Sequence, residues 1–134
     1  MIVALMLAMA APAPAADPCK GSSTPEINAC ISGSLARAQA RLDKYVDAAK
    51  ERCGSEDEAA VRLGIEASQK AFDAYREIEC AAVYEDWKDG TIRGAMHLSC
   101  EVRLTDERTH TVWQNWLQYM DSTPPILPEP KPTE

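Results

Sequence analysis

The sequence predicts an all-α fold, a small antiparallel helical bundle of about three main helices stapled by disulfides. No proline lies between Pro25 and Pro124, which favours helices because proline interrupts their hydrogen bonds. Apolar residues recur along this span at steps of three or four, and no run alternates with period two over the length of a strand. A chain of 134 residues accommodates one such domain, and covalent staples would help to stabilise its modest core.

The first helix is predicted to begin at Ser23–Glu26 and to end at Gly54. Its start combines a hydroxyl cap, a proline at the first helical position and a carboxylate in the first turn. One apolar stripe follows at helical spacing and should face the core. It consists of Ile27, Ile31, Leu35, Ala38, Leu42, Tyr45, Ala49 and Cys53.

The second helix is predicted to begin at Ser55–Glu58, a capping box in which serine and glutamate side chains bond to free amide groups. Most residues of its predicted stripe are small, which allows neighbouring helices to approach closely. The stripe consists of Gly64, Ala67, Ala71, Ala74, Ile78 and Ala81, broadened on one side by Val61, Ile65, Phe72 and Tyr75. The pattern fades around Trp87–Gly90.

A third helix is predicted to follow, with Thr91 as its cap. Its stripe consists of Leu98, Val102, Thr105, Thr109, Val112, Trp116 and Met120. The segment Pro124–Glu134 contains five of the nine prolines of the chain. We expect it to be a disordered tail, either an extended spacer in solvent or a frayed end.

The N-terminal stretch is typical of a secretory signal peptide. Eleven apolar residues precede Ala13–Ala15, whose small side chains suit cleavage near Ala15 or Ala16. The apolar run is shorter than the roughly 20 residues that cross a bilayer, so we expect no membrane insertion. The predicted organisation is a signal peptide at 1–15, a helical domain at 16–123 and the tail at 124–134, in a periplasmic or secreted protein.

Charge narrows the classes of partner. The chain has 14 basic and 21 acidic residues, a formal net charge of -7, and no run of Lys or Arg longer than two. This balance argues against nucleic acid and against adhesion to an anionic membrane surface. It favours encounter with a cationic macromolecule.

Neither a metal site, a cofactor nor an enzyme is predicted. His97 and His110 have only Glu101 and Asp106 as possible ligands at helical offsets, and no Cys-x-x-Cys motif occurs. The sequence contains no Gly-rich phosphate loop and no nucleophile elbow.

The five cysteines favour an oxidising compartment, where disulfides persist. Because five cysteines form at most two intramolecular disulfides, at least one thiol stays unpaired within the chain. Their spacing alone is compatible with 15 ways of forming two bridges. It matches neither a zinc ribbon nor a thioredoxin motif.

A series of residues from the second and third predicted helices resembles the LprI-like lysozyme inhibitors. The family pattern is a Gln with a large aromatic three residues on, then Tyr-Arg and a Cys, a Gly-Ser-Ile-like turn, a second Cys and Thr-x-x-Arg. This chain supplies Gln69, Phe72, Tyr75, Arg76, Cys80, Gly90, Ile92, Cys100, Thr105 and Arg108 in that order. Phe72 stands where Trp is commoner in the family, and Cys53 has no family counterpart.

The resemblance implies the pairings Cys19–Cys30 and Cys80–Cys100. In the loop-entropy model each short ring contributes about 3 kcal/mol of stability. Cys53 would then be a free thiol, which we expect to be a small buried hydrophobe at a helix end. Intermolecular pairing is the alternative.

The motif residues are expected to have structural roles. Arg76 has Asp73, Glu77 and Glu79 within one turn, so we expect a helix ion pair on a solvated face. Arg108 is expected to reach a helix carbonyl or acid and to hold the third helix in register. We expect Gln69, Phe72 and Tyr75 to pack against that helix.

The longest polar stretch within the helical domain, Glu85–Gly94, is the candidate partner-binding site. The resemblance implies a lysozyme-like cationic glycosidase as partner, with paired carboxylates in its active-site groove. Our hypothesis is that Lys88 or Arg93 enters that groove while Glu85, Asp86 and Asp89 meet its basic rim. The alternative is an ordinary exposed loop between helices.

Two other function classes remain open from the sequence. One is a structural or adaptor module of the cell envelope, recruited through a helical face or the proline-rich tail, with no effect on lysozyme. The other is a small hydrolase or thiol enzyme that uses Cys53.

Overall fold

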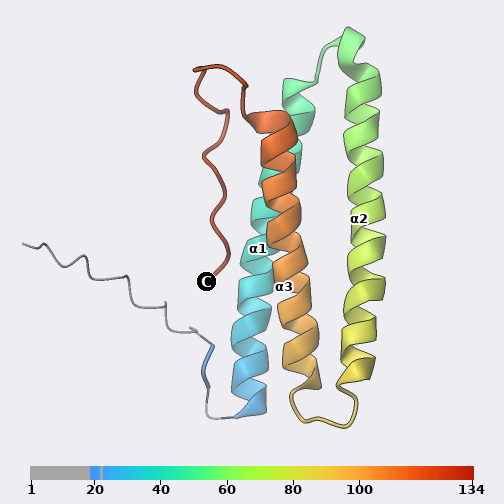
Figure 1. Ribbon diagram of the computed structural model, residues 1–134, viewed down its shortest axis with the longest axis vertical. Helices are drawn as coiled ribbons and strands as arrows, with labels where there is room; N and C mark the ends of the chain where they lie inside the picture. The colour runs from blue at the N-terminus through green and yellow to red at the C-terminus, as the bar shows by residue number, and fades with distance from the viewer. Residues whose placement is uncertain (1–18, 22) are drawn as a thin grey trace, which may run out of the picture.

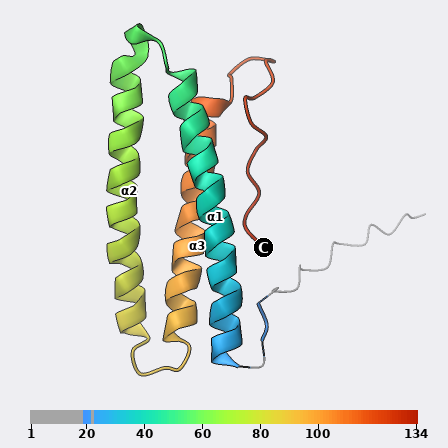
Figure 2. The same cartoon turned by 180° about the vertical axis from the view of Figure 1, so that it is seen from behind.

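A computed structural model of the protein describes residues 19–21 and 23–134. Three long helices follow one another, α1 (Thr24–Arg52), α2 (Ala59–Asp86) and α3 (Arg93–Val112). The 3₁₀ turn η1 (Glu56–Glu58) precedes α2, and the π-helical turn η2 (Trp113–Leu117) extends α3. Neighbouring helices run antiparallel, and α3 lies between α1 and α2 (Figure 1, Figure 2). The predicted antiparallel helical bundle is confirmed. The predicted signal peptide lies outside the described residues.

Helix α1 begins where the sequence predicts. Ser23 is the N-cap, and its Oγ accepts a hydrogen bond from the Glu26 amide at 3.4 Å. The Glu26 carboxylate in turn accepts one from the Ser23 amide at 3.0 Å, which completes a capping box. The helix ends at Arg52, with Cys53 as its C-cap.

The main hydrophobic core lies between α1 and α3, near the end of the bundle where α1 ends. Leu42, Val112 and Leu117 are fully buried there, and the first residues of α2 contribute Ile65. Tyr45, Ala49 and Cys53 of the predicted α1 stripe belong to the same core, as expected from its periodicity.

Helix α2 turns a different face to the bundle from the one predicted. The buried strip includes Ile65 and Cys80, with Phe72 partly buried between them. The predicted stripe of small residues lies on the opposite side of the helix and is exposed, so this prediction is wrong. The exposed set is Gly64, Ala67, Ala71, Ala74, Ile78 and Ala81.

Two predicted helix caps are also wrong. At the start of α2 the Ser55 hydroxyl donates to the Glu58 carboxylate at 2.8 Å instead of accepting from a backbone amide, and the chain makes a 3₁₀ turn. At the start of α3 the N-cap position is Ile92, one residue after Thr91, and no side chain caps the helix.

Both disulfides implied by the family resemblance are present. Cys19 is bonded to Cys30 next to the start of α1, and Cys80 to Cys100 between α2 and α3. Cys53 is a free thiol, 2 % exposed in the main core, as expected. The second bridge therefore fixes α2 to α3 near the loop that joins them.

The C-terminal segment folds back along α1 and α3 (Figure 1). The Ile126 amide donates to the Leu117 carbonyl at 2.8 Å, which reverses the chain. Tyr45 Oη and Trp113 Nε1 then donate to the carbonyls of Pro128 and Leu127 at 2.7 and 2.9 Å. The predicted disordered spacer is therefore replaced by an extended strap, residues 124–134. Prolines lack amide donors, but the carbonyls of this segment accept bonds from side chains.

Candidate functional site

The loop between α2 and α3 lies at one end of the bundle (Figure 1). It turns tightly, because the amides of Lys88 and Gly90 donate to the carbonyls of Glu85 and Trp87 at 3.2 and 2.8 Å. The five residues predicted to bind a partner are all exposed at this end. They are Glu85, Asp86, Lys88, Asp89 and Arg93.

The two cations of the loop have different surroundings. Arg93 Nη1 donates to the Lys88 carbonyl at 3.1 Å, and the guanidinium lies 5.2 Å from the centre of the Tyr84 ring. These contacts tie the first residue of α3 to the loop and to the last turns of α2. The Lys88 ammonium pairs with no acid among the residues that the structure describes.

His97 and the Cys80–Cys100 disulfide brace the base of this loop. His97 Nδ1 lies 2.9 Å from the Cys80 carbonyl oxygen, and its Nε2 lies 3.5 Å from a carboxylate oxygen of Glu101. The imidazole also meets the Tyr84 ring edge-on, with 6.1 Å between ring centres. The loop is therefore held by covalent, polar and aromatic contacts within three turns of its tip.

The motif residues from the family resemblance meet halfway along the bundle rather than at the loop. Two guanidinium groups lie over the Phe72 ring, with Arg76 at 5.5 Å and Arg108 at 5.8 Å from its centre. Contacts of this kind place a cation against the electron-rich face of the ring. Because Arg108 is on α3, this stack joins α2 to α3.

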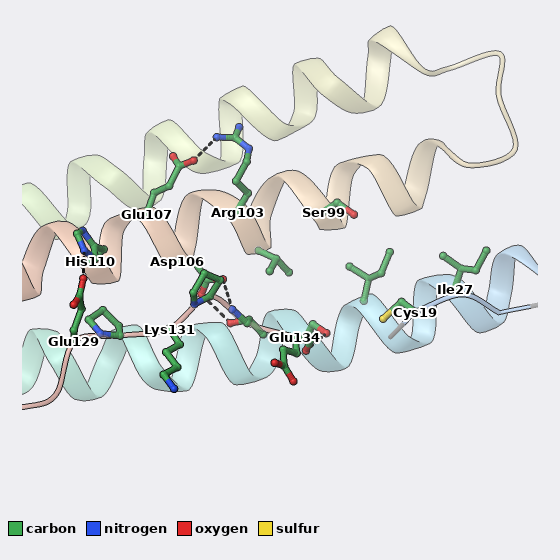
Figure 3. Close-up of a pocket in the computed structure, with 16 residues that line it drawn as sticks. Cys19, Ile27, Ser99, Arg103, Asp106, Glu107, His110, Glu129, Lys131 and Glu134 are labelled. Carbon is green, nitrogen blue, oxygen red and sulfur yellow. Dashed lines mark hydrogen bonds and ion pairs between the residues drawn. The ribbon is translucent and has the colours of Figure 1, made fainter. Parts of the chain in front are cut away.

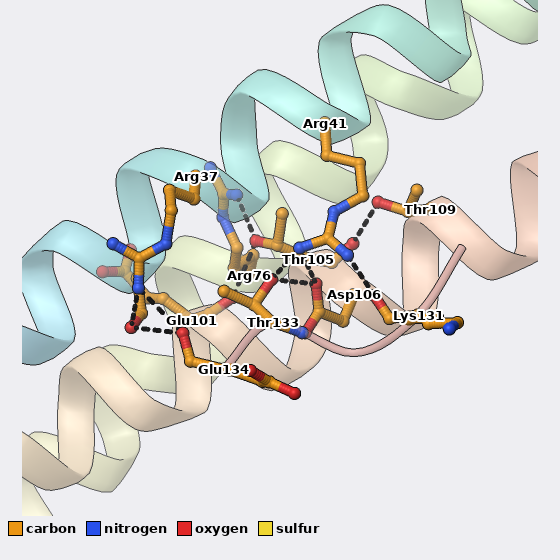
Figure 4. Close-up of polar contacts among 11 residues, drawn as sticks. Arg37, Arg41, Arg76, Glu101, Thr105, Asp106, Thr109, Lys131, Thr133 and Glu134 are labelled. Carbon is orange, nitrogen blue, oxygen red and sulfur yellow. Dashed lines mark hydrogen bonds and ion pairs between the residues drawn. The ribbon is translucent and has the colours of Figure 1, made fainter. Parts of the chain in front are cut away.

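Arg76 forms the predicted ion pair within its own helix, to Asp73, but it also bridges the helices and is mostly buried, so the predicted solvated face is wrong. Its Nη1 donates to Thr105 Oγ1 on α3 at 2.7 Å (Figure 4). The same Nη1 donates to Gln39 Oε1 on α1, also at 2.7 Å. The side chain is 17 % exposed, and Asp73 lies 3.7 Å from Nη2. Only a long side chain with several donors can reach all three groups.

Arg108 holds α3 against α2, but through neither a carbonyl nor an acid. Its Nε donates to Gln69 Oε1 at 3.2 Å and its Nη2 to Ser68 Oγ at 2.8 Å. Partial burial lowers the pKa of Arg108 from its ordinary value, against the opposing effect of Asp73. Gln69 and Phe72 thus meet α3 as predicted, whereas Tyr75 is 51 % exposed.

A second candidate surface is an open cavity of about 750 Å³ between α1, α3 and the strap (Figure 3). Ile27, Ile31 and Val102 give it apolar walls, and charged side chains surround it. Across the cavity, His110 Nε2 on α3 lies 3.1 Å from a carboxylate oxygen of Glu129 on the strap. Sequence reasoning missed this site because one of its walls, residues 129–134, comes from the segment expected to be disordered.

A polar cluster fastens the strap beside this cavity (Figure 4). The Asp106 carboxylate accepts from the Thr133 amide at 2.6 Å and from its hydroxyl at 2.8 Å. Arg41 donates to the Lys131 carbonyl and to the Thr133 hydroxyl, and lies 3.9 Å from Asp106. The cluster joins α1, α3 and the strap.

Among residues 19–21 and 23–134, no group of three or more His, Cys, Asp and Glu side chains is arranged to hold a metal ion. His97 and His110 each face a single carboxylate instead. In the same part of the chain, no helix is both long and apolar enough to span a membrane.

The fold and its bridges define a class of protein, a small helical domain whose disulfides sit beside its N-terminus and beside an exposed charged loop. The model of the family described as Lysozyme inhibitor LprI matches residues 16–112, which is more than half of the chain. The chain therefore belongs to the LprI lysozyme inhibitor family. The match ends where α3 ends, so η2 and the strap lie beyond it. No curated protein and no solved structure matches the chain.

Proposed function

We propose that this protein inhibits a lysozyme-type glycosidase by inserting the α2–α3 loop into the enzyme's active-site groove. The observation that carries this proposal is the bracing of an exposed charged loop by the Cys80–Cys100 disulfide and by Arg93. A loop that is already ordered loses less conformational entropy on binding than a flexible one.

Lys88 is the side chain proposed to enter the catalytic site. Glycosidases of this type place two carboxyl groups on either side of the bond that they cleave. An ammonium group between them would gain two ion pairs and would exclude the substrate. Lys88 is exposed and unpaired within the described residues, whereas Arg93 is engaged in holding the loop. We assign Arg93 as a positioning residue.

The acidic residues Glu85, Asp86 and Asp89 are proposed to meet a basic rim around that groove. All three are exposed at the loop end of the bundle. A formal net charge of -7 would also attract a cationic enzyme before contact, which raises the association rate more than the final affinity. The two disulfides suit a secreted or periplasmic location, where such an enzyme would be met.

The test is a titration of the oxidised protein against several purified lysozymes, following lysis of bacterial cell walls. Reversing the charge with Lys88→Glu should raise the inhibition constant by about 10- to 100-fold, because an acid would then face the catalytic carboxylates. Lys44→Glu is the matched control, since Lys44 is an exposed lysine on α1, away from the loop. This control should inhibit like the unmodified protein.

Salt adds a second measurement to the titration. An electrostatically steered complex should weaken as the salt concentration rises. If Lys88→Glu and Arg93→Glu both inhibit like the unmodified protein, the loop is not the inhibitory site. If no lysozyme is inhibited at all, the envelope adaptor becomes the better interpretation, and a pull-down with an endogenous envelope partner would support it.

A further inference from the structure

The sequence of the strap restricts its backbone to one kind of conformation. Prolines occupy alternate positions, at Pro128, Pro130 and Pro132, and each ring holds its own φ at about -65°. A residue that precedes a proline is pushed into extended or polyproline II backbone, so the other positions of 127–132 are restricted as well. This stretch is accordingly neither helix nor strand. The restraints favour a polyproline II helix, which has three residues per turn and no internal hydrogen bonds.

Helix α1 binds the strap at every third carbonyl. Carbonyls three residues apart lie on one side of a polyproline II helix, and side chains four residues apart lie on one face of an α-helix. Three side chains of α1 with this spacing donate to three carbonyls with that spacing, and Figure 4 shows two of them reaching the strap. The pairs are Tyr45 with the Pro128 carbonyl, Arg41 with the Lys131 carbonyl and Arg37 with the main-chain oxygen of Glu134. Four residues of α-helix advance about 6 Å and one polyproline II turn about 9 Å, and the long arginine side chains span the difference.

Helix α3 contacts a second side of the same segment. Trp113 Nε1 donates to the Leu127 carbonyl at 2.9 Å, and the Leu127 side chain packs against the main core. Six residues on, which is two polyproline II turns, the amide and the hydroxyl of Thr133 both donate to the Asp106 carboxylate. We call this face of the bundle the polyproline II site. It consists of Arg37, Arg41, Tyr45, Asp106 and Trp113.

The bonds from α1 and from Trp113 define the chemical class of ligand, because they end on carbonyls. Every polypeptide has carbonyls, so these donors select a backbone conformation rather than particular side chains. Domains that bind proline-rich peptides likewise use aromatic-lined grooves and a ligand that is already ordered. Side-chain contacts come from Leu127, from Thr133 and from Glu129, which pairs with His110. The site therefore fits a segment with alternate prolines between an aliphatic and a hydroxyl side chain.

The strap is held in a way that lets another segment replace it. None of residues 124–134 is buried, and Leu127, Pro130 and Thr133 are the only half-buried ones among them. A segment with so little buried surface opens locally at a low cost in free energy. The open cavity of about 750 Å³ beside residues 129–134 gives a competing chain access to the same face (Figure 3).

We infer that the polyproline II site binds proline-rich segments, and that the strap is its tethered occupant. The partner is a second protein that carries alternate prolines, and its segment occupies the site after the strap leaves. A tethered occupant competes at an effective concentration of about 1 mM, so the strap excludes segments that fit less well than it does. The site includes no residue of the α2–α3 loop, so this inference is independent of the proposed function.

The first test opens the strap within the full chain. An open-strap variant with Pro128→Gly, Pro130→Gly and Pro132→Gly keeps the carbonyls but frees the backbone, so the strap should detach more often. Proteolysis after residue 118 should become about tenfold faster, while circular dichroism should still show the three helices. Pro130→Gly alone should act in the same direction by about threefold, and it replaces the triple variant if that loses helix. Cleavage as slow as in the unmodified chain, in both variants, would overturn the inference.

A synthetic peptide of residues 124–134 then measures binding by a separate molecule. Fluorescence anisotropy of the labelled peptide should show binding to the open-strap variant at least about tenfold tighter than to the unmodified chain, whose own strap competes. The same peptide with its three alternate prolines replaced by glycine should bind at least about tenfold more weakly, since more backbone entropy is lost. If the proline peptide does not bind the open-strap variant up to about 1 mM, the inference is wrong.

Substitutions in the open-strap variant locate the binding site. Arg41→Ala removes the donor to the middle carbonyl of the segment, and the dissociation constant of the peptide should rise at least about tenfold. Lys44→Ala is the matched control, because Lys44 is an exposed cation of α1 three residues away. This control should bind the peptide like the open-strap variant itself. Equal binding by the two substituted chains would place the peptide on another surface and would reject the site.

The mass of the unmodified chain distinguishes a foreign partner from a second copy. Exchange of straps between two copies would raise the mass from 14.7 kDa to twice that value as the concentration increases. We expect the chain to stay monomeric, because its own strap is present at a higher effective concentration than another copy provides. A dimer that dissociates when the peptide is added would mean that the occupant is the strap of a second copy, which contradicts the inference.

Discussion

Helix α3 is packed by different means on its two sides. Against α1, fully buried apolar side chains such as Leu42 and Val112 form a continuous core. Against α2, the contact is a narrow strip in which the guanidinium groups of Arg76 and Arg108 lie over the Phe72 ring. Burial of apolar surface therefore stabilises the α1–α3 contact, whereas specific polar bonds and one disulfide stabilise the α2–α3 contact.

This difference explains how α2 can leave a whole face to solvent. Apolar packing alone would favour burying Leu63 and Ile78, which are instead exposed. The Arg76 and Arg108 contacts and the Cys80–Cys100 bridge fix the rotation of α2 about its axis. The polar contacts thus determine which face of the helix remains available for another molecule.

The largest expected effect on stability comes from a substitution in the apolar contact between α1 and α3. Leu42→Ala should lower the free energy of unfolding by about 2–5 kcal/mol, because it leaves a cavity in a fully buried site. Leu63→Ala is the matched change at an exposed site on α2, and it should change the free energy of unfolding by no more than about 0.5 kcal/mol. Urea denaturation followed by circular dichroism measures both. If both variants lose the same free energy of unfolding, Leu63 is buried in solution, in contrast to its exposed position in the structure.

Removing the bridge beside the loop should have the next largest effect. The Cys80→Ala/Cys100→Ala variant should lose about 3 kcal/mol, since the bridge closes a ring of some 20 residues in the unfolded chain. Hydrogen exchange should show the loss first in α2. If α1 and α2 lose protection together, the two sides of α3 unfold as one unit, and their different packing does not give them different local stabilities.

The polar bridge itself can be broken at Arg76. Arg76→Ala leaves Gln39 and Thr105 without their shared donor, and we expect a loss of about 1–3 kcal/mol. Arg76→Lys keeps the charge but not the fork of donors, so it should recover only part of that loss. Arg103→Ala is the control, because its pair with Glu107 is 58 % exposed on both sides and should be worth less than about 1 kcal/mol. Thermal unfolding compares all three variants.

Helix periodicity and the family resemblance predicted the fold because each depends on local spacing. The apolar stripe and cap of α1, the two disulfides and the buried Cys53 were all predicted correctly. The face of α2 was not, since its alanine-rich stripe and its buried strip both have helical period. Only contacts with α1 and α3, through Gln39 and Thr105, select between them.

The strap and its cavity could not be predicted for a related reason. Proline excludes helix and strand, and composition then favours an exposed segment. The residues that hold the strap lie far away in sequence and look like ordinary surface side chains, as with Arg41 and Asp106. For the α2–α3 loop, the sequence placed the charged residues correctly at one exposed end of the bundle, and their role as a binding site stays a prediction.

The smallest expected effect concerns the strap. Tyr45→Phe removes one bond to the Pro128 carbonyl, and we expect a loss of about 0.5–1.5 kcal/mol with faster proteolysis after residue 118.

Burial raises the pKa of Tyr45 above 10.0, so the folded state keeps the phenol protonated where the unfolded state ionises. The Tyr45 contribution to stability is therefore intact below pH 10 and falls as the pH rises above it. Tyr45→Phe should lack this part of the alkaline loss, whereas Tyr75→Phe, 51 % exposed on α2, should retain it. An alkaline loss that is the same in both variants would mean that the strap does not bury Tyr45 in solution.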